Sequence, residues 1–258
     1  MQTLNPSAIY SSLSNRVVLV TGGASGIGAA IVEAFSRQSA SVIFLDVQDD
    51  AAGSLKETIE AEGAKVPAYY RCDLTDTNNL QATIAMVMER FGKIDVLVNN
   101  AGNDTRHSVE SVTPEFWDRC IAINLKQQFF ACQAVIPKMR EARYGSIINM
   151  SSIAWTIPST EMSVYVTAKA AIVGMTRTLA HELGGDNIRV NCIMPGAILT
   201  NRQKELWFTP EYEAEVLHSQ ALKRLITPGE VANLALFLAS DASAAITNQS
   251  FVIDAGWT

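Results

Sequence analysis

Cysteine is scarce in this chain of 258 residues, and its arrangement is not that of a metal site or a disulfide framework. The four cysteines, Cys72, Cys120, Cys132 and Cys192, are widely separated and include no Cys-x-x-Cys pair. No histidine lies near enough in sequence to complete a set of metal ligands. We therefore expect reduced, packed thiols and no metal site.

Membrane and secretion signals are missing as well. No segment reaches the roughly 18 apolar residues that a membrane span requires, and residues 1–15 contain neither a basic start nor an apolar run. These absences predict a soluble, cytoplasmic protein that does not bind a membrane. Residues 1–15 are expected to form an N-terminal extension.

The chain also lacks a block or stripe of basic residues. It has 20 Lys and Arg against 26 Asp and Glu, a formal net charge of -6, and a pI near 5.1. Nucleic acid is therefore not an expected partner. With 48% hydrophobic residues and a mean hydropathy of +0.12, the chain can bury the core of one large domain.

What the sequence does contain is an alternation of short β-branched runs with longer helical patterns. Seven runs are predicted strands: Val17–Val20, Ser41–Asp46, Val66–Tyr70, Val96–Asn99, Ser146–Met150, Arg189–Ile193 and Phe251–Asp254. Six stretches are predicted helices: Gly26–Ser39, Ala51–Glu62, Thr77–Phe91, Pro114–Ala142, Tyr165–Leu183 and Pro228–Ala239. The strands are apolar on both faces, as helices on both sides of a parallel sheet require. We predict a single α/β domain over residues 1–258, doubly wound and of Rossmann type, with a seven-stranded parallel sheet.

One connection in this pattern is unusually long. Residues 197–225 separate the sixth predicted strand from the last predicted helix, which exceeds an ordinary loop. We predict that this segment forms a lid over the functional site.

A glycine-rich turn follows the first predicted strand. Gly22, Gly26 and Gly28 open the next helix, so the backbone can approach a pyrophosphate whose charge meets the helix N-terminus. Ser25 and Ile27 lie in the same turn and are included among the expected cofactor contacts. The alternative is a tight strand-to-helix turn without a ligand.

Asp46 closes the second predicted strand and indicates which dinucleotide binds. Its carboxylate can accept bonds from the adenosine ribose hydroxyls and would repel a 2′-phosphate, so NAD is predicted over NADP. Neither Ser25 nor Val47 is basic, which favours the same choice; a helix-capping role for Asp46 is the alternative. Asp73 and Leu74, after the third strand, are expected beside the adenine, although Asp is also an ordinary turn residue there.

Tyr165 and Lys169 are four residues apart in a predicted helix and therefore share one face. An ammonium at Lys169 is expected to favour ionisation of the Tyr165 phenol, whose ordinary pKa is about 10. A phenol in this position can act as a base. Beside a dinucleotide, this pair predicts hydride-transfer chemistry.

Together these motifs resemble the short-chain dehydrogenase/reductase family from about Arg16 to the C-terminus. The resemblance is carried by five features in order: the glycine-rich turn Thr21–Gly28, Asn99-Asn100-Ala101-Gly102, Ser152, Tyr165-x-x-x-Lys169 and Pro195-Gly196. A lone Tyr-x-x-x-Lys is weak, whereas the ordered set is specific.

The resemblance implies a role for each matched residue. Asn124, Ser152, Tyr165 and Lys169 match the family's catalytic set, in which Ser152 and Tyr165 hold the reacting oxygen and Asn124 holds a water that contacts the lysine. The thirteen-residue interval to Tyr165 selects Ser152 over Ser151, which becomes a packing hydroxyl.

The resemblance also implies further cofactor contacts and a homotetramer. The matching cofactor residues are Asn100, Gly102, Pro195, Gly196, Ile198 and Thr200, together with Tyr165 and Lys169. The tetramer is expected to assemble through the helices at Pro114–Ala142 and Tyr165–Leu183, with the last strand at a second interface.

Substrate specificity is expected where polar and aromatic residues follow these motifs. The candidate substrate contacts are Asn103, Arg106, His107, Ser152, Trp155, Glu161, Tyr165, Arg202, Trp207 and Trp257. Directional polar groups suit a polyhydroxylated ligand, because unpaired donors against an apolar ligand cost roughly 1–3 kcal/mol each. The loops are similar to those of aldose 1-dehydrogenases of the D-xylose, L-fucose or L-galactose type.

Other interpretations of single residues stay open. Asp104 and Arg106 can simply pair in a solvated loop, and a Trp is more often a core residue than a ligand platform. Trp117 is assigned to packing, and Trp257 either reaches a partner's site or seals an interface. His181 and His218 are expected on solvated helical surfaces.

The function predicted from sequence is NAD-dependent oxidation of an aldose at its anomeric hydroxyl, with Tyr165 as general base. One alternative is an NAD-dependent secondary-alcohol or ketone dehydrogenase acting on a substrate other than a sugar. The other is an NAD-binding sensor or scaffold without turnover, which the complete catalytic set disfavours.

Overall fold

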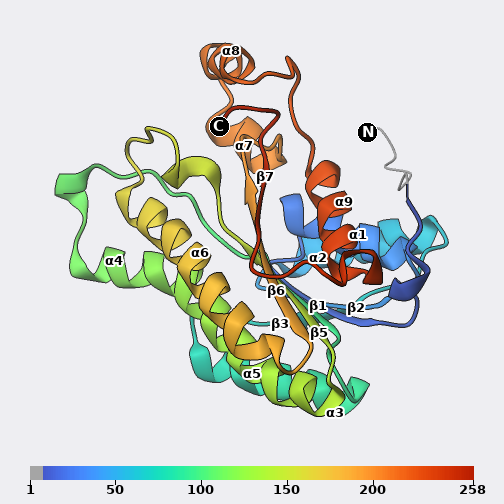
Figure 1. Cartoon of the computed structure of the whole chain (residues 1–258). Helices are drawn as coiled ribbons and strands as arrows, with labels where there is room; N and C mark the ends of the chain where they lie inside the picture. The colour runs from blue at the N-terminus through green and yellow to red at the C-terminus, as the bar shows by residue number, and fades with distance from the viewer. Residues whose placement is uncertain (1–7) are drawn as a thin grey trace.

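A seven-stranded parallel sheet forms the centre of the computed structural model, which describes residues 8–258 (Figure 1). The strands are β1 (Val17–Thr21), β2 (Ser41–Asp46), β3 (Ala68–Arg71), β4 (Val96–Asn99), β5 (Gly145–Met150), β6 (Ile188–Pro195) and β7 (Ser250–Ile253). Each of the seven predicted strands is confirmed, with small shifts at the ends. β3 begins at Ala68 rather than at Val66, because Pro67 has no N–H to give to the ladder.

The strand order places a reversal of winding at the middle of the sheet. The order is β3-β2-β1-β4-β5-β6-β7, so the chain winds outward in opposite directions from β1 and β4. Ligands of such sheets bind at the carboxyl ends of the strands beside this reversal. The glycine-rich turn after β1 and the Asn-Asn-Ala-Gly turn after β4 both lie there.

Helices cover both faces of the sheet, as predicted (Figure 1). They are α1 (Gly26–Arg37), α2 (Asp49–Ala61), α3 (Thr77–Phe91), α4 (Pro114–Ile121), α5 (Gln127–Ala142), α6 (Ser163–Gly184), α7 (Asn201–Leu206), α8 (Pro210–Ser219) and α9 (Pro228–Ala239). One core cluster joins α1, α2 and α9 to the sheet, and a second joins α3, α5 and α6 to its other face. The sheet is therefore buried on both sides.

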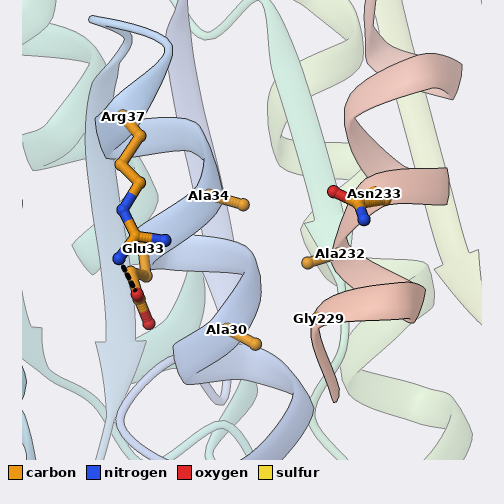
Figure 2. Close-up of a pocket in the computed structure, with 7 residues that line it drawn as sticks. All are labelled: Ala30, Glu33, Ala34, Arg37, Gly229, Ala232 and Asn233. Atoms are coloured by element: carbon orange, nitrogen blue, oxygen red, sulfur yellow. Dashed lines mark ion pairs between the residues drawn. The ribbon is translucent and has the colours of Figure 1, made fainter. Parts of the chain in front are cut away.

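Small residues bring α1 and α9 together. Figure 2 shows Ala30 and Ala34 of α1 facing Gly229 and Ala232 of α9 across a narrow gap, while the Arg37–Glu33 ion pair lies along α1 itself. Small side chains let two helices approach closely. This contact fixes α1, whose first turn carries the glycine-rich segment.

The predicted helix Pro114–Ala142 is wrong in one respect, because a π-helical turn at Ala122–Lys126 interrupts it. Inside that turn the Asn124 amide donates to the carbonyls of Cys120 and Asn103, each at 3.0 Å. The wider turn holds Asn124 inward and fully buried. Helical periodicity alone does not reveal such an insertion.

The long connection before α9 contains the short helices α7 and α8, which were not predicted. Thr200 and Thr209 cap them by accepting hydrogen bonds from the backbone N–H groups of Gln203 and Tyr212, each at 3.2 Å. Thr209-Pro210 repeats the Thr-Pro start that predicted two other helices, so a signal for α8 was present. Both helices stand at the carboxyl edge of the sheet (Figure 1).

The N-terminal extension is described only in part. Residues 1–7 lie outside the described residues, whereas Leu13 is fully buried and the backbone N–H of Tyr10 donates to the Gln38 side chain at 2.8 Å. Within residues 8–258, no helix has both the length and the apolar character needed to cross a membrane.

Candidate active site

The glycine-rich turn is tied directly to the end of β4. The Asn100 side-chain amide donates to the carbonyls of Thr21 at 3.1 Å and Gly22 at 2.8 Å. The Thr21 hydroxyl in turn accepts from the backbone N–H groups of Asn100 and Ala101. Asn100, predicted as a cofactor contact, thus uses its amide to shape the turn.

Close packing explains why glycine is needed in this turn. A Cβ on Gly28 would lie 1.9 Å from the Gly22 carbonyl oxygen, and Gly22 itself has a positive φ of 64°. Opposite the turn, the Thr200 methyl lies 3.4 Å from where a Cβ on Gly26 would be. The first turn of α1 and Thr200 therefore border one space, whose N–H donors fit a pyrophosphate.

Asp46 is buried and anchors the same turn. Its carboxylate accepts from the backbone N–H of Ala24 at 2.9 Å, of Val47 at 2.8 Å and of Gln48 at 3.1 Å. These bonds precede α2, so the alternative of Asp46 as a cap for that helix is not what the structure has. The ribose contact stays a prediction that shares the carboxylate with these donors.

Asp73 forms a local turn at the end of β3. Its carboxylate accepts from the Thr75 hydroxyl at 2.6 Å and the Thr75 backbone N–H at 2.9 Å, and these bonds hold the Asp73 pKa below its ordinary value. The Leu74 side chain is buried. The turn alternative is confirmed for Asp73, and its adenine contact stays a prediction.

The side chains of the predicted catalytic set lie together at the carboxyl edge of β4 and β5. The Lys169 ammonium donates to the Met150 carbonyl at 2.9 Å and lies 5.5 Å from the centre of the Tyr165 ring. A Cβ on Gly102 would lie 3.1 Å from Asn124 Oδ1 and 3.2 Å from Lys169 Nζ. The absence of a side chain at Gly102, just after β4, therefore leaves room for both polar groups.

The two serines before this helix differ as predicted. Ser151 is buried, and its hydroxyl donates to the Lys169 carbonyl at 2.6 Å, which makes it a packing hydroxyl. Ser152 is only half-buried; its oxygen accepts from the Ala154 backbone N–H at 3.1 Å, and it is hydrogen-bonded to Tyr165. Ser152 is thus the serine that faces the tyrosine.

Burial dominates the ionisation of Tyr165 and Lys169. It raises the pKa of Tyr165 and Asp104 raises it further, whereas Ser152 and Arg106 lower it. Desolvation of the phenolate is the largest effect and sets the direction of the Tyr165 pKa, so the lowering expected from the Lys169 ammonium does not dominate. Burial also lowers the pKa of Lys169 to about 8.

The segment after β6 lies at the same carboxyl edge of the sheet. Gly196 packs against Asp254, since a Cβ there would lie 2.8 Å from the Asp254 Cβ. Ile198 pairs with Ile226 in an isolated parallel bridge, which directs Thr200 toward the glycine-rich turn. Pro195, Gly196, Ile198 and Thr200 stay predicted cofactor contacts.

The polar loop after β4 contacts residues 202–207, in and just after α7, through several side chains. The Asp104 carboxylate accepts from Gln203 Nε2 at 2.7 Å and pairs with the Arg202 guanidinium at 3.4 Å. The Arg106 guanidinium lies 5.3 Å from the centre of the Trp207 ring. Asp104 therefore pairs with Arg202, which replaces the Asp104–Arg106 pair that the sequence allowed.

Asp104 is also the site residue that sequence reasoning undervalued. The sequence presents it as one polar group in a loop, whereas in the structure it bonds Gln203 of α7 and raises the pKa of Tyr165. No local pattern pairs it with residues almost one hundred positions away. Asn103 joins the same contact, since its side-chain Oδ1 accepts from the Arg202 guanidinium at 3.3 Å.

His107 is a structural residue, contrary to its predicted role in substrate binding. It is buried against Phe116, its Nδ1 lies 3.1 Å from the Thr105 carbonyl, and its Nε2 accepts from the Val164 backbone N–H at 3.3 Å. Because a carbonyl only accepts and an amide N–H only donates, the proton belongs on Nδ1. The ring thus fastens the loop to the start of α6 at Val164.

The tryptophans and Glu161 fall in different surroundings. Trp117, assigned to packing, is instead 42% exposed on α4. Trp257 packs on a cluster of its own chain that includes Ile153, and Trp155 is 38% exposed just after Ser152. Glu161 has a positive φ of 58° and its carbonyl accepts from the His107 backbone N–H.

The remaining cysteines and histidines behave as expected. Cys72, Cys132 and Cys192 are buried and Cys120 is half-buried, all as free thiols, while His181 and His218 are exposed. In the part of the chain that the structure describes, no group of three or more His, Cys, Asp or Glu side chains is placed to hold a metal ion.

A phosphate-binding turn, a tyrosine–lysine pair and a serine at one edge of a doubly wound sheet define an oxidoreductase that uses a nicotinamide cofactor. Comparison with known proteins agrees. A family described as enoyl-(acyl carrier protein) reductase matches residues 22–258. The chain belongs to the short-chain dehydrogenase/reductase family, as predicted.

The similar proteins include sugar dehydrogenases. D-xylose 1-dehydrogenase from Caulobacter vibrioides is 49% identical and is matched over 97% of this chain and 99% of its own length. A Rhizobium meliloti protein named "Probable galactose dehydrogenase GalD" is 46% identical over 97% of this chain and 98% of its own. A 3-oxoacyl-[acyl-carrier protein] reductase from Brucella melitensis, solved with bound NAD, is 35% identical, with a TM-score of 0.87 over 97% of this chain and 94% of its own.

Proposed function

We propose that this enzyme oxidises the anomeric hydroxyl of a free aldose to the lactone, with NAD as the hydride acceptor. The observation that carries the proposal is the similarity to two sugar dehydrogenases, at 46% and 49% identity over 97% of this chain. The polar contacts between Asp104, Arg202 and Gln203 at the mouth of the site support it, since a polyhydroxylated ligand can exchange bonds with such groups.

The proposed roles follow from the positions of the side chains. Ser152 and Tyr165 hold the reacting oxygen, and Tyr165 removes its proton while the nicotinamide, when bound, accepts the hydride. Lys169 would bond the ribose of a bound nicotinamide cofactor, and the positive charges of Lys169 and of the oxidised cofactor would favour the phenolate. Asn124 is assigned to hold a water in contact with Lys169, through which the proton leaves.

A panel of substrates tests the proposal. Purified enzyme with NAD is assayed for NADH production with D-xylose, D-galactose, L-fucose and L-galactose, and separately with steroids, acyl thioesters and simple secondary alcohols. We expect turnover with at least one aldose. NADH production only with the second group would reject the sugar assignment and leave a secondary-alcohol dehydrogenase; no turnover at all would favour the NAD-binding sensor.

We expect Asp46→Ala to improve the use of NADP relative to NAD by at least about tenfold in kcat/KM, because a buried carboxylate near the ribose repels a 2′-phosphate. The ratio is measured with both cofactors at saturating substrate. Asp46→Asn is the matched variant, since it removes the charge and keeps an acceptor for the Ala24 N–H. An unchanged ratio in both variants would refute the choice of NAD by Asp46.

Residues 197–225 are proposed to act as a lid, held closed by Asp104. We expect Asp104→Asn to move the ascending limb of the kcat/KM profile, where activity rises as the base is deprotonated, to lower pH, because Asp104 raises the Tyr165 pKa. The substrate KM should rise, since the bonds to Arg202 and Gln203 weaken. Glu89→Gln, exposed on α3, is the control; a limb that stays or moves upward contradicts the assignment.

A homotetramer is proposed from the apolar groove between α5 and α6. Phe129 is 45% exposed, and with Leu125, Phe130 and Met175 it lines this groove. A second copy of the chain would cover these rings, as the family resemblance suggests. Sedimentation velocity should give about four times the chain mass of 28.0 kDa; a monomer would contradict the proposal.

A further inference from the structure

Two consecutive glutamines are buried at the start of α5, directly after the π-helical turn that carries Asn124. Gln127 is 1% exposed and Gln128 is fully buried. A polar amide loses its water on burial, which costs free energy unless the amide finds a partner. The partners of these two amides lie at the active-site edge of the sheet.

Each glutamine donates to a backbone carbonyl at the end of a central strand. Gln127 Nε2 donates to the Ala101 carbonyl at 3.1 Å, just after β4, and Gln128 Nε2 donates to the Met150 carbonyl at 3.3 Å, at the end of β5. Neighbouring residues of a helix point in different directions, so one turn can reach two adjacent strands. The two bonds therefore fix the ends of β4 and β5 relative to each other.

These carbonyls flank the active-site lysine. The Met150 oxygen that accepts from Gln128 also accepts from Lys169 Nζ at 2.9 Å. Ala101 precedes Gly102, where a Cβ would lie 3.2 Å from the same nitrogen. A shift of either carbonyl would thus displace the ammonium or the backbone that borders it.

Packing alone does not explain why these residues are glutamines. Within residues 8–258, Oε1 of Gln127 and Oε1 of Gln128 are buried and have no protein hydrogen-bond partner. A buried acceptor without a partner costs free energy, which an unbranched apolar side chain such as Met avoids. A glutamine differs from such a side chain by its amide N–H donor, which both residues use.

We propose that Gln127 and Gln128 are positioning residues that hold the Ala101 and Met150 carbonyls and thereby the Lys169 ammonium in its catalytic position. The inference rests on the proposed role of Lys169 and deepens it. It is independent of which alcohol the enzyme oxidises.

The charged and titratable groups that face Lys169 come from four elements. They are Asp104 in the polar loop, Cys120 on α4, Tyr165 on α6 and Cys192 on β6. None of them is altered by a change at Gln128. A shift in the pH profile of a Gln128 variant therefore reports on the Met150 carbonyl and Lys169.

The test compares Gln128→Met with Gln133→Met, a substitution on the same helix. Gln133 accepts a hydrogen bond from Gln81 on the exposed side of α5 and does not contact the site. We expect Gln128→Met to lower kcat about 10- to 100-fold with little change in the KM for NAD, because misplacement of a catalytic group affects the chemical step. Its pH profile should shift by at least about 0.3 unit, since Met150 then accepts from Lys169 alone. Gln133→Met should match wild type in each measurement.

Three results would overturn the inference. One is a Gln128→Met enzyme with wild-type kcat and pH profile. Another is a loss of kcat that disappears at a lower temperature at which the variant is fully folded, which would make the residue merely structural. The third is a wild-type profile for Gln127→Met and Gln128→Met combined. If wild type oxidises a non-sugar alcohol only, the aldose proposal fails while this comparison still applies with that alcohol.

Discussion

Tyr165→Phe is expected to lower kcat by about 10³- to 10⁴-fold while NAD binding stays close to wild type. The substitution removes only the hydroxyl that the site brings next to Ser152, and general-base catalysis contributes effects of this size. Because the ring stays in place, the packing of α6 should not change. Turnover is measured with the best substrate of the panel, and NAD binding by calorimetry.

Tyr70→Phe is the matched control for this experiment. Tyr70 lies on β3, and its hydroxyl accepts from Arg90 at 3.1 Å on the surface. It should retain wild-type kcat. If Tyr165→Phe kept more than about a tenth of the activity, Tyr165 would not be the base; if it lost NAD binding as well, its effect would be on the cofactor site.

Lys169→Met should have the second largest effect, and its two consequences should point in opposite directions. We expect kcat to fall about 10²- to 10³-fold, because the charge that favours the phenolate is lost. The melting temperature at pH 7 should rise by about 2–6 °C, because a buried ammonium whose pKa is lowered by desolvation opposes folding. Met fills a similar volume and carries no charge.

The pH dependence of stability separates this cause from a simple packing effect. The Lys169 pKa falls from an ordinary value of 10.5 to about 8 in the folded enzyme, so between these values the unfolded chain binds more protons. Wild type should therefore gain stability relative to Lys169→Met as the pH rises from about 8 to 10.5. A difference in unfolding free energy that does not change across this window, measured by urea denaturation, would show that Lys169 is not destabilised by burial.

Features that depend on neighbouring residues in the chain were predicted correctly. The apolar runs predicted all seven strands, and the glycines after β1 predicted the turn, because local side chains set strand propensity and tight turns. The order of the motifs indicated membership of the short-chain dehydrogenase/reductase family. Ser151 and Ser152 were also separated correctly by their spacing from Tyr165.

Features that depend on contacts between distant segments were not predicted from the sequence. In the π-helical turn Asn124 bonds Asn103 of a distant loop, and the role of His107 depends on Val164 of α6. The Tyr165 pKa followed burial and Asp104 rather than the nearby lysine, since solvent exclusion is a property of the whole fold.

The sequence by itself determined the fold class and the family and predicted a catalytic set, because local pattern and motif spacing carry that information. Only the tertiary structure decided the contacts around the set: Lys169 bonds the Met150 carbonyl, Gln127 and Gln128 bond the Ala101 and Met150 carbonyls, and Asp104 bonds Gln203 of α7. These arrangements join segments that are far apart in the chain. Their geometry depends on packing and desolvation, which no local pattern of residues specifies.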